Sequence, residues 1–190
     1  MPIALAVVFG FCAVAMIGIM VYFSCIDTKT DLGSFERIIR FNDIWGTHRG
    51  FMWVRSIWIF GDASFIEKLF GVGPDMFYSA FSPYFDDLSK YGDSSTNAAH
   101  NEYLNYLITI GITGLLSYLA IVCGTIKNAV KYAKENPMLI ACVSAVICYA
   151  VQSVVNLYQP ITTPLFFIFI ALCEAFVRNA KAEKSAVSAV

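Results

Sequence analysis

Charge is scarce in this chain. Only 14% of its 190 residues are Asp, Glu, Lys or Arg, whereas an ordinary soluble domain carries about a quarter. The mean hydropathy is +0.64, and long windows contain no charged residue at all. This distribution excludes an ordinary soluble domain and predicts a polytopic membrane protein. The net charge of −1 says nothing about partners, because the charges are segregated by segment, but the lack of a basic stripe argues against nucleic-acid binding.

Clustered metal ligands and paired cysteines are also missing from the sequence. The six cysteines form no Cys-x-x-Cys pair, and all but Cys25 lie in apolar windows, where they are expected to pack as small apolar residues. The two histidines, His48 and His100, have no cluster of cysteines or carboxylates around them, so no zinc site is predicted. Asp86 and Asp87 most simply form a solvated acidic face, and a divalent cation there is the alternative.

Four mostly uncharged stretches are long enough to cross a bilayer, at about 1.5 Å per residue across roughly 30 Å of hydrocarbon. They are predicted at residues 1–24, at residues 103–126, and as two helices within residues 138–177. The first stretch lacks a basic n-region and is too long for the h-region of a signal peptide, so a transmembrane helix is predicted there.

The basic residues of the short loops predict the orientation. Lysines and arginines concentrate in residues 127–137 and 178–190, which are therefore expected to form a cytoplasmic loop and a cytoplasmic tail. Residues 25–102 then lie outside, and a loop of that length is usually functional. The predicted fold is an all-α membrane protein with about four transmembrane helices and one large extracytoplasmic loop that contains short amphipathic helices.

One segment of the loop suits an anionic substrate. Residues 43–60 carry tryptophans and arginines in a pattern typical of an amphipathic helix at the membrane interface. Arg49 and Trp53 are four residues apart and would share a helical face. A guanidinium binds phosphate oxygens at two positions at once, which suits a lipid-linked phosphate. The alternative is that Arg49 and Arg55 only anchor this helix to lipid headgroups.

His100 stands where the polar loop meets the predicted helix 103–126. Its unperturbed pKa lies near neutrality, so its imidazole can accept a proton from an attacking hydroxyl. The alternative is a structural hydrogen bond beside Asn101 and Glu102. His48, next to Arg49, is the competing candidate, and residue chemistry barely separates the two histidines.

Four motifs occur in a specific order along the chain. They are G-T-H-R-G-F-M-W from Gly46, L-F-G-V-G-P-D-M-F from Leu69, A-H-N-E-Y-L-N-Y-L from Ala99 and I-G-I-T-G-L-L-S-Y from Ile110. This series resembles the C-terminal domain of the O-antigen ligase and O-antigen polymerase superfamily, in detail over roughly residues 40–125. Members are about twice as long, with around a dozen spans and a further functional arginine in an earlier loop that has no counterpart here. The resemblance, together with the missing basic flank at the N-terminus, indicates a C-terminal portion of a longer protein or a truncated product.

The resemblance implies glycosyl transfer outside the bacterial inner membrane, in the synthesis of lipopolysaccharide or another envelope polysaccharide. A glycan would pass from undecaprenyl pyrophosphate to a sugar hydroxyl on a glycan or lipid acceptor, without a metal or a cofactor. By position in the motifs, Arg49 would hold the pyrophosphate and His100 would deprotonate or orient the acceptor hydroxyl. Substrate-binding residues are expected beside them. These are Arg55, Trp53, Asn101 and Tyr103.

Two alternatives compete with this interpretation. The length of the chain favours a non-catalytic membrane subunit or a truncated fragment. A polysaccharide transporter fragment would carry charged or proline-broken residues in the middle of its spans, whereas the mid-span positions here are apolar. Ligase and polymerase share the four motifs, so the sequence leaves the acceptor open.

Overall fold

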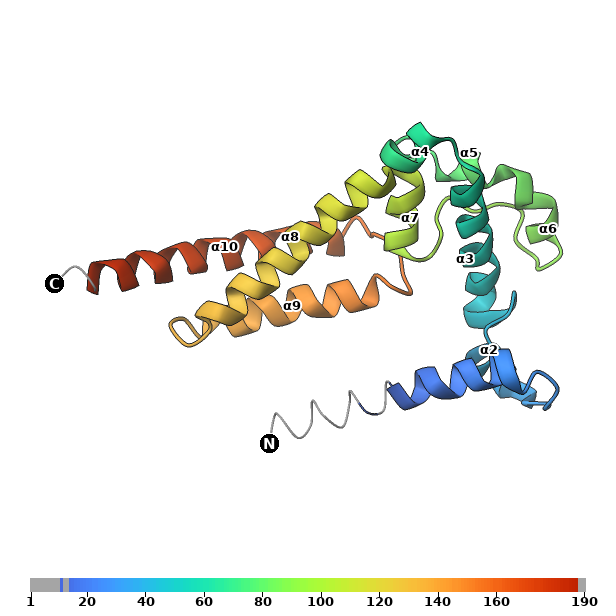
Figure 1. Ribbon diagram of the computed structural model, residues 1–190, viewed down its shortest axis with the longest axis horizontal. Helices are drawn as coiled ribbons and strands as arrows, with labels where there is room; N and C mark the ends of the chain where they lie inside the picture. Colours follow the sequence, from blue (N-terminus) through green and yellow to red (C-terminus); the bar gives the residue numbers. More distant parts are fainter. Residues whose placement is uncertain (1–10, 12–13, 188–190) are drawn as a thin grey trace.

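The computed structural model describes residues 11 and 14–187, and this part of the chain contains helices and loops but no strand (Figure 1). The all-α prediction is therefore confirmed for the described residues. The N-terminal helix is described over Val14–Ile26, and its last turn, η1 (Tyr22–Ile26), is a π-helix. The short elements are η2 (Gly33–Phe35), α2 (Glu36–Ile39), α4 (Phe65–Phe70), α5 (Phe77–Phe81), η3 (Ser82–Tyr84) and α6 (Phe85–Ser89). The longer helices are α3 (Trp45–Asp62), α7 (Glu102–Thr109), α8 (Gly111–Tyr132), α9 (Met138–Gln152) and α10 (Thr162–Val187).

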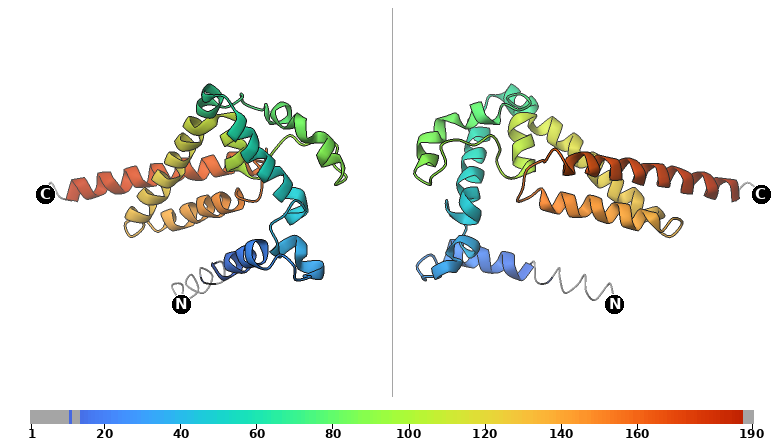
Figure 2. Two further views of the ribbon diagram at one scale, coloured as in Figure 1. Left: turned by 45° about the vertical axis from the view of Figure 1, so that its right-hand side comes forward. Right: turned by 180° about the vertical axis from the view of Figure 1, so that it is seen from behind.

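The three long C-terminal helices, α8, α9 and α10, pack against one another as a bundle (Figures 1 and 2). Their buried contacts come from small, branched and aromatic side chains. Two clusters hold them together, one around Leu139, Cys142, Cys173 and Val177 and one around Tyr118, Val122, Val146 and Phe166. The outward faces are also apolar, with Leu116 59% exposed, Ile140 56% and Ile168 52%. Apolar side chains on both faces of a bundle are expected when lipid, not water, surrounds it.

Membrane-crossing capacity is clearest for one helix. Among the described residues, α8 alone is both long and apolar enough to span a bilayer, while Val14–Ile26 and α9 are apolar but shorter. The four-span topology and the outside location of residues 25–102 therefore stay predictions.

The helix expected to run without interruption from residue 103 to 126 is in fact two helices, α7 and α8, which meet at Ile110. The backbone of residues 69–73 packs directly on this break. The Val72 amide donates to the Ile108 carbonyl at 2.9 Å, and the Gly73 amide donates to the Thr109 carbonyl at 3.0 Å. Gly111 has φ +69, and a Cβ there would lie 2.4 Å from the Leu69 carbonyl oxygen. Gly111 therefore serves a backbone turn and a close approach, not the packing of two spans.

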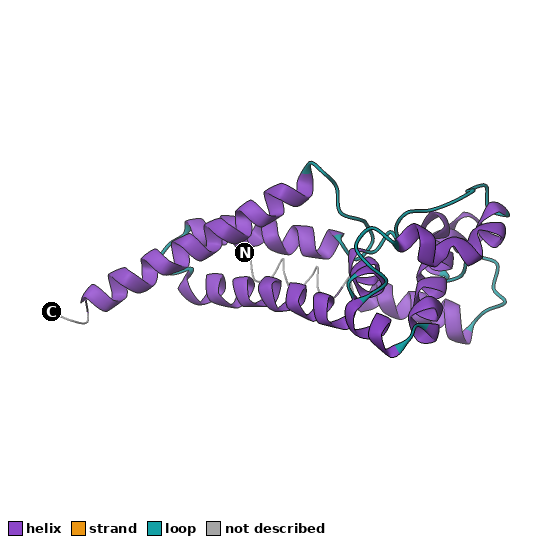
Figure 3. Ribbon diagram, turned by 90° about the horizontal axis from the view of Figure 1, so that it is seen from above, coloured by secondary structure: helices purple, strands orange, loops and turns teal. Residues whose placement is uncertain are grey.

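Residues 36–109 form a second body with its own core, which we call the head. Its helices gather at one end of the molecule, and the long bundle helices extend toward the other end (Figures 1 and 3). The core of the head is aromatic and aliphatic, and includes Phe51, Met52, Phe77, Phe81, Leu88 and Ile108. Most of the predicted loop is thus a folded unit. The N-terminal helix meets it at Arg40, whose Nε donates to the Phe23 carbonyl at 3.0 Å.

Candidate functional site

Arg49 is placed by a sharp bend at the start of α3. Gly46, Thr47 and His48 have φ values of +59, +58 and +69, so three consecutive residues adopt the left-handed conformation, which is uncommon for residues other than glycine. Regular helix resumes at Arg49, and the bend brings Gly50 so close to the preceding turn that a Cβ would collide with the Asn42 carbonyl. Arg49 is partly buried. Its Nη1 donates to the Gly46 carbonyl at 3.1 Å, and its buried Nε has no partner among the described residues.

His100 lies at the entry to α7 in another strained position. Its φ is +50, and the next residue, Asn101, is the N-cap, whose side chain accepts the Leu104 amide at 3.0 Å. Helix α3, which carries Arg49, packs against α7, which begins two residues after His100. The pKa of His100 is lowered by partial burial and then by the positive charge of Arg49, while Asp93 opposes the shift. The charge of Arg49 therefore acts on the His100 imidazole, and the catalytic roles of these two residues stay a prediction.

The lowered pKa keeps the His100 imidazole neutral to lower pH than a free histidine, which is the form that can accept a proton. We expect the pKa of His100 to lie below 6.5 and to rise toward 6.5 in Arg49→Gln, because one of the groups that disfavours the imidazolium is removed. The chain has two histidines. In a His48→Gln background labelled with 13C-histidine, His100 gives the one histidine signal, and NMR follows its titration. Arg37→Gln, which replaces an exposed arginine, is the control and should not move the pKa. A His100 pKa at or above 6.5 in the parent protein would contradict the placement of Arg49.

Arg55 is occupied by a partner in the head. Its Nη2 donates to Asp43 Oδ2 at 2.9 Å and its Nη1 donates to the other carboxylate oxygen, so the guanidinium fork is filled. The guanidinium also lies 4.0 Å from the centre of the Phe51 ring, and Tyr91 donates to the same Asp43 carboxylate at 3.3 Å. Arg55 thus ties the segment before α3 to the body of that helix. Its predicted contact with substrate stays a prediction.

The other expected binding residues have structural contacts of their own. The Trp53 ring packs on Trp45 with 5.1 Å between centroids, and its buried Nε1 has no partner among the described residues. Asn101 caps α7, as described above. The Tyr103 hydroxyl donates to the Ala150 carbonyl of α9 at 2.7 Å. Trp53 therefore lies one helical turn beyond Arg49, and Asn101 and Tyr103 hold the helix that follows His100.

His48, the competing histidine, packs on Tyr91. The two rings are 5.0 Å apart between centroids and are tilted by 33°. The Nδ1 atom of His48 is buried and lacks a partner among the described residues. This histidine belongs to the bend that positions Arg49.

Glu102 is a site residue whose role the sequence did not reveal. It is 1% exposed, accepts the Tyr106 hydroxyl at 2.8 Å and accepts Ser153 Oγ at 2.6 Å. The Glu102 amide also donates to the Ser153 carbonyl at 2.9 Å. These bonds clamp the first turn of α7 to the end of α9, two residues from His100. The Glu102–Tyr106 spacing of four residues was a usable signal, but nothing in the sequence pointed to Ser153.

No group of three or more potential metal ligands gathers within the described residues. Asp87, one of the two acidic residues considered for a cation, forms an ion pair with Lys90 at the surface. The expectation that no metal is needed stays a prediction.

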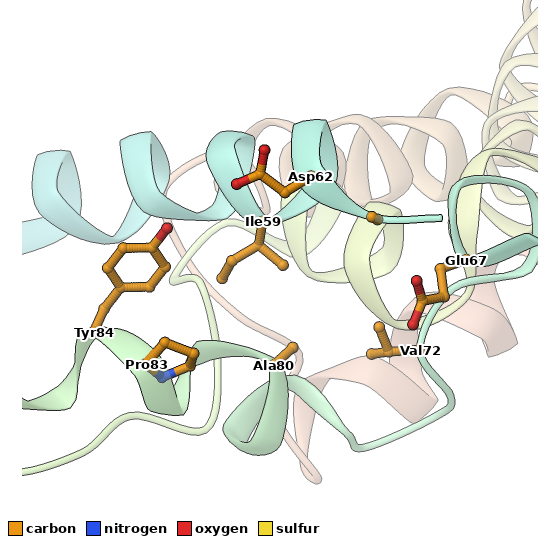
Figure 4. Close-up of a pocket in the computed structure, with 8 residues that line it drawn as sticks. Ile59, Asp62, Glu67, Val72, Ala80, Pro83 and Tyr84 are labelled. Atoms are coloured by element: carbon orange, nitrogen blue, oxygen red, sulfur yellow. The ribbon is translucent and has the colours of Figure 1, made fainter. Parts of the chain in front are cut away.

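Two pockets border the head. The first, about 400 Å³, lies between the end of α3, α4 and the α5–η3 segment, and Figure 4 shows its mostly apolar wall of Ile59, Val72, Ala80 and Pro83. Glu67 at its edge accepts the Ser64 amide at 2.8 Å as part of a capping box, so its carboxylate is committed to α4. The second, about 320 Å³, lies beside α7, and its lining combines apolar side chains with polar ones such as Asn97 and Asn105.

Apolar bundle helices beside a folded head are the features expected of a helical membrane protein with a site outside the bundle. The comparison with family models is more specific. Residues 3–119 match the O-antigen ligase family, which is more than half of the chain and includes both Arg49 and His100. The chain belongs to the O-antigen ligase family. Neither the curated proteins nor the solved structures contain a match to it. Membership supports a membrane protein of bacterial envelope polysaccharide synthesis, of the glycosyltransferase type.

Proposed function

We propose that this protein transfers a glycan from undecaprenyl pyrophosphate to a sugar hydroxyl at the outer face of the inner membrane. The observation that carries the proposal is the pairing of Arg49 with His100 inside the domain that matches the O-antigen ligase family. A guanidinium suits the pyrophosphate of the donor, and a neutral imidazole suits the hydroxyl of the acceptor. The two substrates would meet between these two side chains.

The proposed reaction is a displacement at the anomeric carbon. The acceptor oxygen forms the new C–O bond, its proton passes to His100, and the bond between the anomeric carbon and the pyrophosphate oxygen breaks. The electron pair of that bond leaves with the pyrophosphate, where negative charge builds up. Arg49 is positioned to stabilise this charge in a partly buried site, where such an interaction is strongest. The leaving group travels with the donor, so no nucleotide is needed outside the cytoplasm.

The remaining binding residues support this arrangement in different ways. Trp53 extends the Arg49 face of α3 toward the lipid-linked donor. Asn101 and Tyr103 fix the start of α7, and Arg55 holds the head together through Asp43. The four-span topology, with residues 25–102 outside, would place the site where polyprenyl-linked sugars are found.

The surface polysaccharide made by the producing bacterium can be analysed to test the proposal and to distinguish a ligase from a polymerase. Deleting the gene should leave lipopolysaccharide without its polysaccharide ladder if the protein is a ligase. It should leave single repeat units on the lipid core if the protein is a polymerase. Gel electrophoresis of lipopolysaccharide reads both outcomes, and a plasmid copy of the gene should restore the ladder. An unchanged ladder and unchanged capsular polysaccharide after deletion would contradict the proposed function.

A further inference from the structure

The pocket beside α7 has the position of a second substrate site. It has a volume of about 320 Å³ and lies between the turn at Asp75, the loop at Asn97, α7 and the connection from α9 to α10 at Tyr158. Small-molecule pockets in proteins have volumes of about 300–1,000 Å³. This pocket is at the lower end of that range, so it fits one sugar ring better than a polyprenyl chain or an oligosaccharide.

Its lining suits hydroxyl groups rather than phosphate. Asp75 is the only charged residue among the lining residues, and neither lysine nor arginine contributes to the wall. A carboxylate repels a pyrophosphate, but it accepts hydrogen bonds from sugar hydroxyls. The pocket therefore discriminates against the charged group of the donor.

Two polar side chains of the pocket are free to bind. Within the described residues, neither the carboxylate of the exposed Asp75 nor the side-chain amide of the exposed Asn97 makes a hydrogen bond or an ion pair. Tyr158, which is 40% exposed, also lines the pocket and adds an aromatic ring to it. A carboxylate, an amide and an aromatic ring together match the hydroxyl groups and the apolar C–H face of a sugar ring.

The pocket is joined to His100 through Asn105. The Asn105 Oδ1 atom accepts the Ala99 amide at 3.4 Å, and Ala99 directly precedes His100. Asn97 lies on the same loop, three residues before His100. A sugar bound in this pocket would therefore lie beside the loop that carries the imidazole.

We propose that this pocket is the acceptor-sugar subsite and that Asp75 and Tyr158 hold one ring of the acceptor glycan. The inference rests on the proposed function. It adds a binding site that is separate from Arg49, so donor and acceptor are held by different parts of the protein. Asp75 and Tyr158 act in binding, whereas His100 acts in the chemical step.

Steady-state transfer in membrane vesicles that contain the full chain tests the subsite. The probes are undecaprenyl-pyrophosphate-linked repeat unit as donor and, as acceptor, either the lipid-linked core or a second repeat unit, all isolated from the same bacterium. In Asp75→Ala and in Tyr158→Ala we expect KM for the acceptor to rise about tenfold or more, with kcat and the donor KM within about twofold, because uniform binding is lost. Asp86→Ala and Tyr78→Ala, which change exposed residues outside the pocket, are the matched controls.

Direct binding separates failure of the subsite from failure of the proposed chemistry. Saturation-transfer NMR with the delipidated core and repeat-unit saccharides should show contact with the parent protein in nanodiscs and with His100→Ala. The contact should be lost in the Asp75→Ala/Tyr158→Ala double variant, whose folding is checked by its thermal transition. Equal saccharide binding by the parent and the double variant, or no binding by either, would overturn the subsite. Full transfer activity in His100→Ala would instead contradict the proposed function, while the binding result would still decide the subsite.

Discussion

Replacing His100 with alanine should lower the rate of glycan transfer by about 10²- to 10⁴-fold, the usual contribution of a positioned general base. The structure gives the physical reason, since burial and the neighbouring Arg49 keep this imidazole neutral and able to accept a proton. Transfer is measured in vesicles at saturating donor, with the amount of inserted protein set equal by immunoblot. Activity in the parent should fall only below pH 6.5, because protonation of His100 removes the base.

Arg49→Ala belongs to the same experiment and should lower the rate by about 10²- to 10³-fold, as loss of a charge-stabilising donor does elsewhere. Arg49→Lys should recover part of that loss, since it keeps the charge without the planar fork. Arg37→Ala is the matched control, because Arg37 is an exposed arginine that precedes α3. His48→Ala decides between the two histidines. An inactive His48→Ala beside an active His100→Ala would reverse the assignment of the base.

Gly71→Ala and Gly111→Ala should each destabilise the protein by about 2 kcal/mol or more. Both glycines have positive φ, a conformation that costs other residues about 1–3 kcal/mol. A Cβ at Gly71 would also lie 2.3 Å from the Thr109 carbonyl, and one at Gly111 would lie 2.4 Å from the Leu69 carbonyl. Because the obstructing atoms are backbone, no side-chain rotation relieves the collision. Thermal unfolding in one detergent measures the loss.

Gly61→Ala is the matched control for this pair. Gly61 lies within helix α3, and a Cβ there would meet nothing within 4 Å. Alanine favours a helix by up to about 1 kcal/mol over glycine, so this variant should be neutral or slightly more stable. A Gly71→Ala protein as stable as Gly61→Ala would show that the turn at residues 69–73 does not pack on the α7–α8 break.

Local features of the sequence predicted much of the helical fold. Apolar windows indicated the bundle helices, because lipid-facing and core-facing positions are both apolar. The tryptophans and arginines of residues 43–60 indicated the helix that became α3, and the motif order suggested one site for Arg49 and His100, which stays a prediction. These features depend on neighbours along the chain or on the family motif, and both can be recognised without coordinates.

Contacts between distant segments explain what the sequence did not predict. The break at Ile110 lies inside an uncharged window, and it depends on backbone hydrogen bonds from residues 72 and 73. The burial of Glu102 depends on Ser153, which is 51 residues away. By hydropathy, Gly111 is only a small residue within an apolar span. By the same criterion Glu102, an acid at the start of a helix, is expected to be solvated. The three-dimensional arrangement shows that Gly111 packs against the backbone of Leu69 and that Glu102 binds Ser153.

The clamp from Glu102 to Ser153 has a mechanical consequence for the site. The end of α9 and the first turn of α7 are tied by a carboxylate, a hydroxyl and two backbone groups, so a tilt of α9 is transmitted to His100 with little slack. In the predicted four-span topology α9 crosses the bilayer, and a mismatch between helix length and bilayer thickness can change helix tilt. We therefore expect the rate of the proposed transfer to depend on the thickness of the lipid bilayer around the protein.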